Sequence, residues 1–177
     1  LQHPIRDAVY IMADFKFLTD EDVAAVLRGV IDDFLIPKFK ELNMNASGKW
    51  IASLETERRA PNVGVIRGID YSYYLVNGRG ANKDQSLEGL RKWAVWAGNT
   101  FIKDWVQAKG LTANPIAVAM SIAKKGTTWK RKGGSDLLEV LESPEVQRYV
   151  AERFKMIITP RVAEEMRRNI SEAFRNV

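Results

Sequence analysis

The sequence predicts an α+β fold in which helices pack on a small antiparallel β-sheet. Two observations predict it: apolar residues recur at helical spacing over residues 23–35, and they alternate with polar residues over residues 49–57. A chain of 177 residues, 46% of them apolar, can bury one core. We therefore expect a single domain with an N-terminal helical arm (about 1–45), a core (about 46–134) and C-terminal helices (about 135–177).

A long N-terminal helix is predicted to begin at Thr19. Thr19 can cap the helix, and Asp22 stands three residues later, where it can complete a capping box. Three consecutive carboxylates then meet the positive end of the helix dipole. Pro37 falls inside the apolar pattern, so we expect it to kink the helix or to end one segment, with helicity resuming as far as about Met44.

A β-hairpin is expected over residues 49–69. Residues 49–57 alternate as a half-buried strand does, and residues 58–62 contain a proline and an asparagine that are typical of a turn. Residues 63–69 form a second β-like run. Together the two runs predict the small antiparallel sheet.

Short helices are predicted in the centre of the chain. One covers residues 87–97, with Gly98 as its C-terminal cap, and a shorter one ends at Gly110. The next begins at Asn114-Pro115, a capping residue followed by proline at the first helical position, and it is expected to end at Gly126.

The C-terminal helix has the same kind of start. Ser143 is a capping residue that stands before Pro144, and the apolar pattern then runs toward Phe174. We expect Pro160 to break or to kink this helix midway.

Residue types that carry catalysis are scarce. The chain has no cysteine, which excludes disulfides and thiolate–metal sites and favours a cytosolic or assembly setting. His3, the single histidine, stands near a terminus, so it cannot supply a zinc site or a Cys/His pair. We therefore expect no enzyme, no metal and no cofactor. No apolar run approaches the roughly 18–20 residues of a membrane span, so no membrane partner is expected.

The middle third of the chain holds the whole positive charge surplus. Residues 79–134 carry 11 basic and three acidic side chains, whereas the flanking parts are nearly balanced, and the net charge is +5. A localised surplus favours a surface that faces phosphate or an acidic partner, and a solvated basic face is the plainer alternative.

A glycine-rich stretch, residues 124–134, concentrates cations around one tryptophan. The candidate residues for a subunit interface, or for a surface that faces a lumen or DNA, are Lys124, Lys125, Trp129, Lys130, Arg131 and Lys132. Such a loop can follow a nucleic-acid backbone by neutralising phosphates, with the tryptophan stacked on a base. It can equally anchor a protein interface, or remain a solvated loop.

Arg79 is a further candidate, because it stands between two glycines. The glycines free the backbone and leave the guanidinium room to pair bidentately, so we expect a structural salt bridge or a subunit contact. The aromatic run 71–74 precedes it. Aromatics beside a strand end are usually core residues, so we expect these tyrosines to be buried.

These motifs together resemble the neck or tail-completion proteins of tailed bacteriophages, the small components that connect head and tail. The resemblance covers roughly residues 50–130 and departs from the family at residues 81–84, where a proline-bearing stretch is expected. The matching residues are Tyr71, Tyr74, Asn77, Gly78, Arg79, Gly80, Leu90, Trp93, Ala119, Ile122, Ala123, Lys125, Gly126 and Thr127.

The resemblance implies a structural virion protein of the head–tail junction. Copies of the chain would form a ring, six- or twelvefold, that joins the portal or connector to the tail, with packaged DNA passing through the lumen. The protein would be made in the cytoplasm of a bacterial host. One alternative is a basic nucleic-acid-binding module that uses the 124–134 loop. Another is a magnesium nuclease, which would have to bring together Glu55, Glu57 and Asp70.

Overall fold

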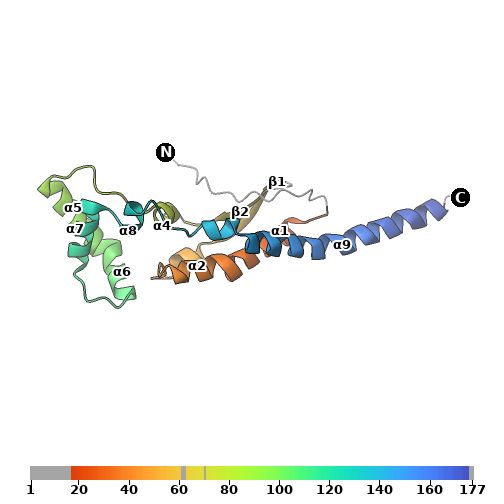
Figure 1. Ribbon diagram of the computed structural model, residues 1–177, viewed down its shortest axis with the longest axis horizontal. Coiled ribbons are helices and arrows are strands. Elements are labelled where there is room, and N and C mark those ends of the chain that lie inside the picture. Colours follow the sequence, from red (N-terminus) through yellow and green to blue (C-terminus); the bar gives the residue numbers. More distant parts are fainter. Residues whose placement is uncertain (1–16, 61–62, 70, 176–177) are drawn as a thin grey trace. The chain divides into compact units, whose positions relative to one another are not determined.

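The computed structural model describes residues 17–60, 63–69 and 71–175 (Figure 1). It contains helices and one two-stranded antiparallel sheet, so the predicted α+β class is confirmed. The chain divides into two compact units made of interleaved segments. Unit 1 takes its described residues from Leu1–Pro37, Leu54–Arg67 and Glu139–Val177, and unit 2 from Lys38–Ser53 and Gly68–Leu138. That the units fold as a single domain stays a prediction.

Unit 1 begins with helix α1 (Asp20–Val30), and the predicted capping box is present. The side chain of Thr19 accepts a hydrogen bond from the backbone N–H of Asp22 at 3.2 Å, and the Asp22 carboxylate accepts one from the N–H of Thr19 at 2.8 Å. The apolar face of α1 packs on the hairpin and on the C-terminal helix. Its buried residues are Val23, Val26, Leu27 and Val30.

Pro37 does not end the first helical stretch. Helix α1 continues through the π-helical segment η1 (Ile31–Leu35) into α2 (Ile36–Glu41). The backbone N–H of Ile36 donates to the carbonyl of Ile31, five residues back, immediately before the proline that has no N–H to donate. The wider π turn therefore leads the chain into Pro37 without a break, as such single-turn segments do inside α-helices. The stretch ends at Glu41, short of the expected Met44.

The hairpin consists of β1 (Glu55–Ala60) and β2 (Val63–Arg67), with Glu55 opposite Arg67 and a register shift between Arg58 and Ala60. The first strand begins at Glu55, later in the chain than the expected start at residue 49. Residues Lys49–Ala52 form helix α3 instead, and the strand runs into the predicted turn.

Packing of Trp50 explains why α3 replaces the expected strand. Trp50 is 4% exposed, and its ring stacks on Phe39 with 4.4 Å between the ring centroids. Its indole N–H also donates to the Ser72 hydroxyl at 2.9 Å. This tertiary packing fixes a helical turn where the alternating pattern alone favours a strand.

The C-terminal part of unit 1 comprises the short 3-10 helix η3 (Glu139–Glu142) and α9 (Pro144–Arg175). The predicted start is confirmed, because the Ser143 hydroxyl accepts a hydrogen bond from the N–H of Val146 at 3.3 Å. Pro160 does not break the helix, which runs on as one element (Figure 1). Proline removes one backbone donor, and the regular hydrogen bonds on both sides hold the helix together.

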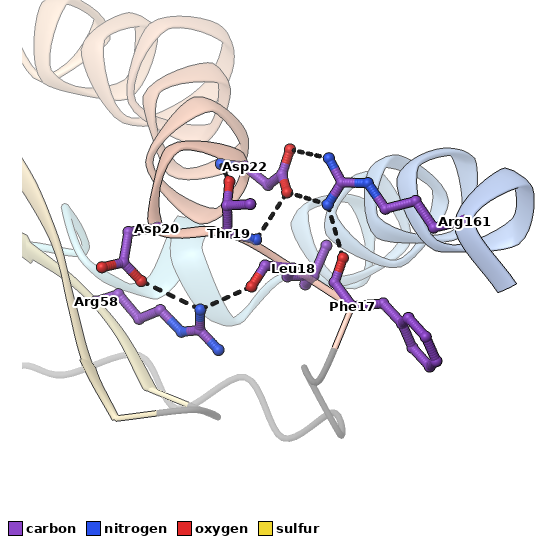
Figure 2. Close-up of polar contacts among 7 residues, drawn as sticks. All are labelled: Phe17, Leu18, Thr19, Asp20, Asp22, Arg58 and Arg161. Carbon is purple, nitrogen blue, oxygen red and sulfur yellow. Dashed lines mark hydrogen bonds and ion pairs between the residues drawn. The ribbon is translucent and has the colours of Figure 1, made fainter. Parts of the chain in front are cut away.

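The start of α1 is joined to α9 by ionic and backbone hydrogen bonds (Figure 2). The guanidinium of Arg161 pairs with the Asp22 carboxylate through both of its terminal nitrogens, one of them at 3.0 Å from Asp22 Oδ1. The same guanidinium donates to the carbonyl of Phe17 at 2.6 Å. Arg58 donates to the carbonyl of Leu18 at 2.8 Å and so ties the hairpin to the same turn.

Unit 2 is mostly helical. Its elements after α3 are α4 (Ser72–Asn77), α5 (Leu87–Ala97), the π-helical η2 (Gly98–Ile102), α6 (Lys103–Ala108), α7 (Pro115–Lys125) and α8 (Thr128–Arg131). Helices α5 and α7 lie side by side (Figure 1) and share a core with η2 and α6. The buried residues of that core are Ala94, Ala97, Ile102, Val106 and Ala119.

The sequence suggested that Gly98 caps α5, but the helical stretch does not end there. The chain continues through η2 into α6, and the predicted ends at Gly110 and Gly126 are the ones that hold, both with positive φ. A Cβ atom at Gly98 would lie 2.8 Å from the Cα atom of Ile116. The glycine is therefore required by the close approach of η2 to α7 rather than by a helix end.

Candidate functional site

The two short motifs that carry the resemblance lie against each other in unit 2. The backbone N–H of Thr127 donates to the carbonyl of Arg79 at 2.8 Å, and the N–H of Arg79 donates to the Thr127 hydroxyl, also at 2.8 Å. Residues 78–80 and 125–127, which we call the crossing, are thus joined although Arg79 and Thr127 stand 48 positions apart.

Two glycines of the crossing, one in each segment, are required by the backbone geometry. Gly78 has φ +67°, and a Cβ atom there would lie 2.2 Å from the backbone nitrogen of Lys130. Gly126 has φ +73°, and its Cβ atom would lie 2.7 Å from the carbonyl oxygen of Arg79. Only glycine adopts these backbone angles without strain and leaves room for such an approach.

Further hydrogen bonds continue the pairing on both sides of the crossing. On one side, Ser135 donates its N–H to the carbonyl of Val76 at 2.6 Å and its hydroxyl to the carbonyl of Leu75 at 2.9 Å. On the other side, the N–H of Asn82 donates to the carbonyl of Ala123 at 2.8 Å. Residues 75–82 are therefore held along residues 123–135 at both ends as well as at the crossing itself.

The side chain of Arg79 is used inside the chain. Its guanidinium carbon lies 3.9 Å from the centroid of the Trp93 ring, which is a cation–π contact. It donates to the carbonyl of Gly80 at 3.1 Å and to the side-chain oxygen of Asn82 at 2.6 Å. Partial burial lowers the pKa of this guanidinium from its ordinary value. The guanidinium thus contacts an aromatic ring and two neutral oxygens in place of the carboxylate that a salt bridge would require. The other expectation, a subunit contact, stays a prediction.

The crossing holds the cationic stretch, residues 124–132, which we call the basic segment. Lys124 and Lys125 close the last turn of α7, and Lys130 and Arg131 lie in α8. The expected loop is therefore partly helical, because the Thr127 hydroxyl caps α8 by accepting from the N–H of Lys130 at 3.4 Å. All five cations of the segment are exposed, and within the described residues none of them forms an ion pair.

Trp129 is partly buried beside these cations. The ammonium of Lys132 lies 5.8 Å from the centroid of its ring, and the carbonyl of Trp129 accepts a hydrogen bond from the N–H of Gly134 at 2.9 Å. The ring thus lies beside a cation of the basic segment and keeps part of its surface in solvent.

The tyrosines before the crossing are not core residues. Tyr73 is 57% exposed and Tyr74 is 54% exposed, because both lie on the short helix α4, which packs on α8. These two tyrosines are additional candidates for a binding surface, and sequence reasoning missed them by placing them at the end of a strand.

Of the carboxylates in the nuclease alternative, the structure gives Glu57 other partners. Glu57 pairs with Arg67 at 2.6 Å on the hairpin, and also with Arg59 at 3.6 Å. Asp70 and His3 lie outside the described residues. Within residues 17–60, 63–69 and 71–175, no three His, Cys, Asp or Glu side chains form a group that could hold a metal ion.

Comparison with protein-family models, with curated proteins and with solved structures finds no match to this chain. Among the helices of the described residues, none is long and apolar enough to cross a membrane.

Proposed function

We propose that this chain is a structural protein of the phage head–tail junction, a neck or tail-completion component without enzymatic activity. One observation carries the proposal. The Gly-Arg-Gly and Lys-Gly-Thr motifs form a single interlocked crossing, in which backbone bonds and close glycine contacts position a row of unpaired cations. Such an arrangement fits a surface that binds a large charged partner.

The proposed assembly is a ring, six- or twelvefold, between the portal or connector and the tail. A closed ring requires heterologous contacts, in which each copy offers two different surfaces. The basic segment would face the lumen, where it would meet the phosphates of the passing DNA, or it would contact an acidic neighbour. The protein would then be located in the virion.

A basic nucleic-acid-binding module is the second candidate. It is favoured by the five unpaired cations and by the aromatic rings of Trp129, Tyr73 and Tyr74 on the adjoining short helices α8 and α4. If all five cations contacted duplex phosphates, the logarithm of the binding constant would fall with that of the salt concentration with a slope of about −4 to −5.

The deciding experiment is the location and copy number of the chain in its native particle, by cryo-electron microscopy of purified virions. A closed ring at the head–tail vertex, with residues 124–132 at a subunit contact or at the lumen, would support the proposal. Absence from every particle, together with salt-sensitive binding of DNA or RNA by the free protein, would favour the second candidate instead.

A further inference from the structure

The first third of helix α9 is fixed to unit 1 by apolar packing. The buried residues of α9, Val146, Val150 and Phe154, all lie in this part. Tyr149 packs edge-on against Phe34 with 5.2 Å between the ring centroids, and its hydroxyl leaves no room for a side chain at Gly29 of α1. The direction of this part of the helix is therefore set by its contact with α1.

Beyond Phe154, Arg161 makes the polar contacts between α9 and other elements of the described chain. It pairs with Asp22 through both terminal nitrogens and donates to the carbonyl of Phe17 at 2.6 Å (Figure 2). In residues 162–175, the described side-chain hydrogen bonds and ion pairs join residues of α9 to each other, as Arg167 and Glu164 do at 2.8 Å. Polar contact with α1 thus ends at Arg161.

Pro160 stands directly before this last contact. Its ring nitrogen has no N–H to donate to the carbonyl of Met156, so the helix lacks one backbone hydrogen bond there. Prolines inside helices are a principal site of bending. The helix is therefore easiest to bend at a point that lies beyond its apolar packing.

We propose that Pro160 is a hinge and that the contact between Arg161 and Asp22 is its latch. When the latch is closed, the two parts of α9 stay in line, and when it opens, residues 162–175 bend about Pro160. The pair can open because the Arg161 side chain is 40% exposed and that of Asp22 17%, and partly exposed ion pairs are weakened by solvent and salt.

The moving part carries exposed apolar side chains. Met166, Ile170 and Phe174 all lie beyond the hinge, and all three are exposed. A single carboxylate of α1 then determines where these side chains are presented. The inference concerns the free chain and does not depend on the proposed function.

Distances between pairs of spin labels, measured by pulsed electron paramagnetic resonance, test the hinge, because the chain contains no native cysteine. The pair Ala25→Cys, Ser171→Cys joins α1 to the part of α9 beyond Pro160. The matched pair Ala25→Cys, Ala151→Cys joins α1 to the packed part. All three positions are exposed, and with the latch intact each pair should give one narrow distance distribution.

Arg161→Gln opens the latch and should add a second, displaced population to the distribution between positions 25 and 171. Ser171 lies about 16 Å beyond Pro160 along the helix, so a bend of about 20° moves it by roughly 6 Å. The distribution between positions 25 and 151 should not change. The control Arg168→Gln removes the same charge from an exposed position of the same helix and should leave both distributions narrow.

Restoring the backbone hydrogen bond separates a hinge from general loosening. Pro160→Ala, added to Arg161→Gln, returns the missing N–H and should restore the single narrow distribution between positions 25 and 171. Asp22→Asn opens the same latch from α1 and should give the same second population, so the test does not depend on one variant.

Several results would overturn the inference. One is a narrow distribution between positions 25 and 171 in both Arg161→Gln and Asp22→Asn. Another is equal broadening of both label pairs, which would mean that the whole helix loosens from α1. A second population that persists after Pro160→Ala would place the bend elsewhere, and a broad distribution with the latch intact would show that Arg161 does not hold the helix.

Discussion

Single residues determine whether the crossing can form. Gly78 and Gly126 satisfy two requirements at once, a positive φ and an approach to backbone atoms of the opposite segment. The chain also contains glycines that meet one of these requirements or neither. Gly48 has φ +73° in open space, and Gly80 has open space with no need of a positive φ. Substitutions at these positions therefore separate backbone strain from steric contact.

We predict that Gly78→Ala lowers the free energy of unfolding by about 3 kcal/mol, because strain and overpacking each cost roughly 1–3 kcal/mol. Gly48→Ala should show only the strain, about 1 kcal/mol, and Gly80→Ala should be neutral within about 0.5 kcal/mol. Urea unfolding measures all three. Equal stability of Gly78→Ala and the unsubstituted chain would mean that the two segments do not approach each other this closely.

Asp22 has two functions at the start of α1 (Figure 2). It closes the capping box with Thr19, and it receives the guanidinium of Arg161 from α9. The hydrogen bond from Arg161, followed by those from Thr19, lowers the pKa of this carboxyl below its ordinary value of 3.8. A carboxyl with a lowered pKa in the folded state stabilises that state when it is ionised.

The stability contribution of Asp22 is therefore complete above pH 3.8 and is lost as the pH falls below that value. We predict that Asp22→Asn lowers the free energy of unfolding near neutral pH, and that this difference from the unsubstituted chain shrinks in acid. Urea unfolding at a series of pH values measures the difference. The exposed Asp33→Asn is the control, and a difference that does not change with pH would argue against the ionised pair.

At the scale of elements, two helical stretches pass through π-helical segments. Segment η1 precedes Pro37, and η2 begins at Gly98, where the chain approaches α7. Each segment changes the hydrogen-bond spacing at a place where the regular α pattern meets an obstacle, a missing donor in one case and a neighbouring backbone in the other. Neither stretch ends where its proline or glycine suggested.

We predict that Gly98→Ala destabilises the packing of η2 on α7 by about 1–3 kcal/mol, because the new methyl group meets backbone atoms of Ile116. Gly89→Ala is the control within α5, since its methyl group meets only the flexible side chain of Asp84. Thermal unfolding monitored by tryptophan fluorescence compares the two. A more stable Gly98→Ala, as helix propensity alone predicts, would contradict the close approach.

Local signals predicted the helix starts well, and some helix ends and the positions of strands less well. The capping box at Thr19, the Asn114-Pro115 start and the stop at Gly126 all depend on residues that are adjacent or nearly so, and they hold in the structure. The strand expected from residue 49 fails because Trp50 packs on Phe39, a contact that the alternating pattern does not contain. Tertiary packing overrides a short local pattern in such a segment.

At the scale of the whole molecule, the parts of the candidate site were predictable from the sequence, and the contact between them was not. Counting charges along the chain located the basic segment, and the two glycine motifs were each visible as short stretches. Their meeting was not predictable, because the hydrogen bonds that join them connect residues 48 positions apart, without periodicity or spacing to mark the pair.

The basic segment allows a test of the assembly as a whole. We predict that Lys130→Glu with Arg131→Glu disrupts particle assembly or DNA retention and leaves the fold intact, because both side chains are exposed and neither forms an ion pair within the described chain. Lys40→Glu with Lys155→Glu makes the same charge change at exposed positions outside the segment and should be tolerated. Circular dichroism checks the fold, and particle yield and DNA content measure the effect. Normal virions from the first variant would contradict a role for the segment.

The interleaving of the two units has a consequence for the order of events during synthesis. Unit 1 needs α9, because α1 packs on it, Arg161 holds Asp22, and Tyr149 packs edge-on against Phe34 with 5.2 Å between their centroids. All residues of unit 2 leave the ribosome before residue 139, whereas unit 1 must wait for the last part of the chain. The long-range closure of unit 1 is then a late step, which follows the emergence of every residue of unit 2.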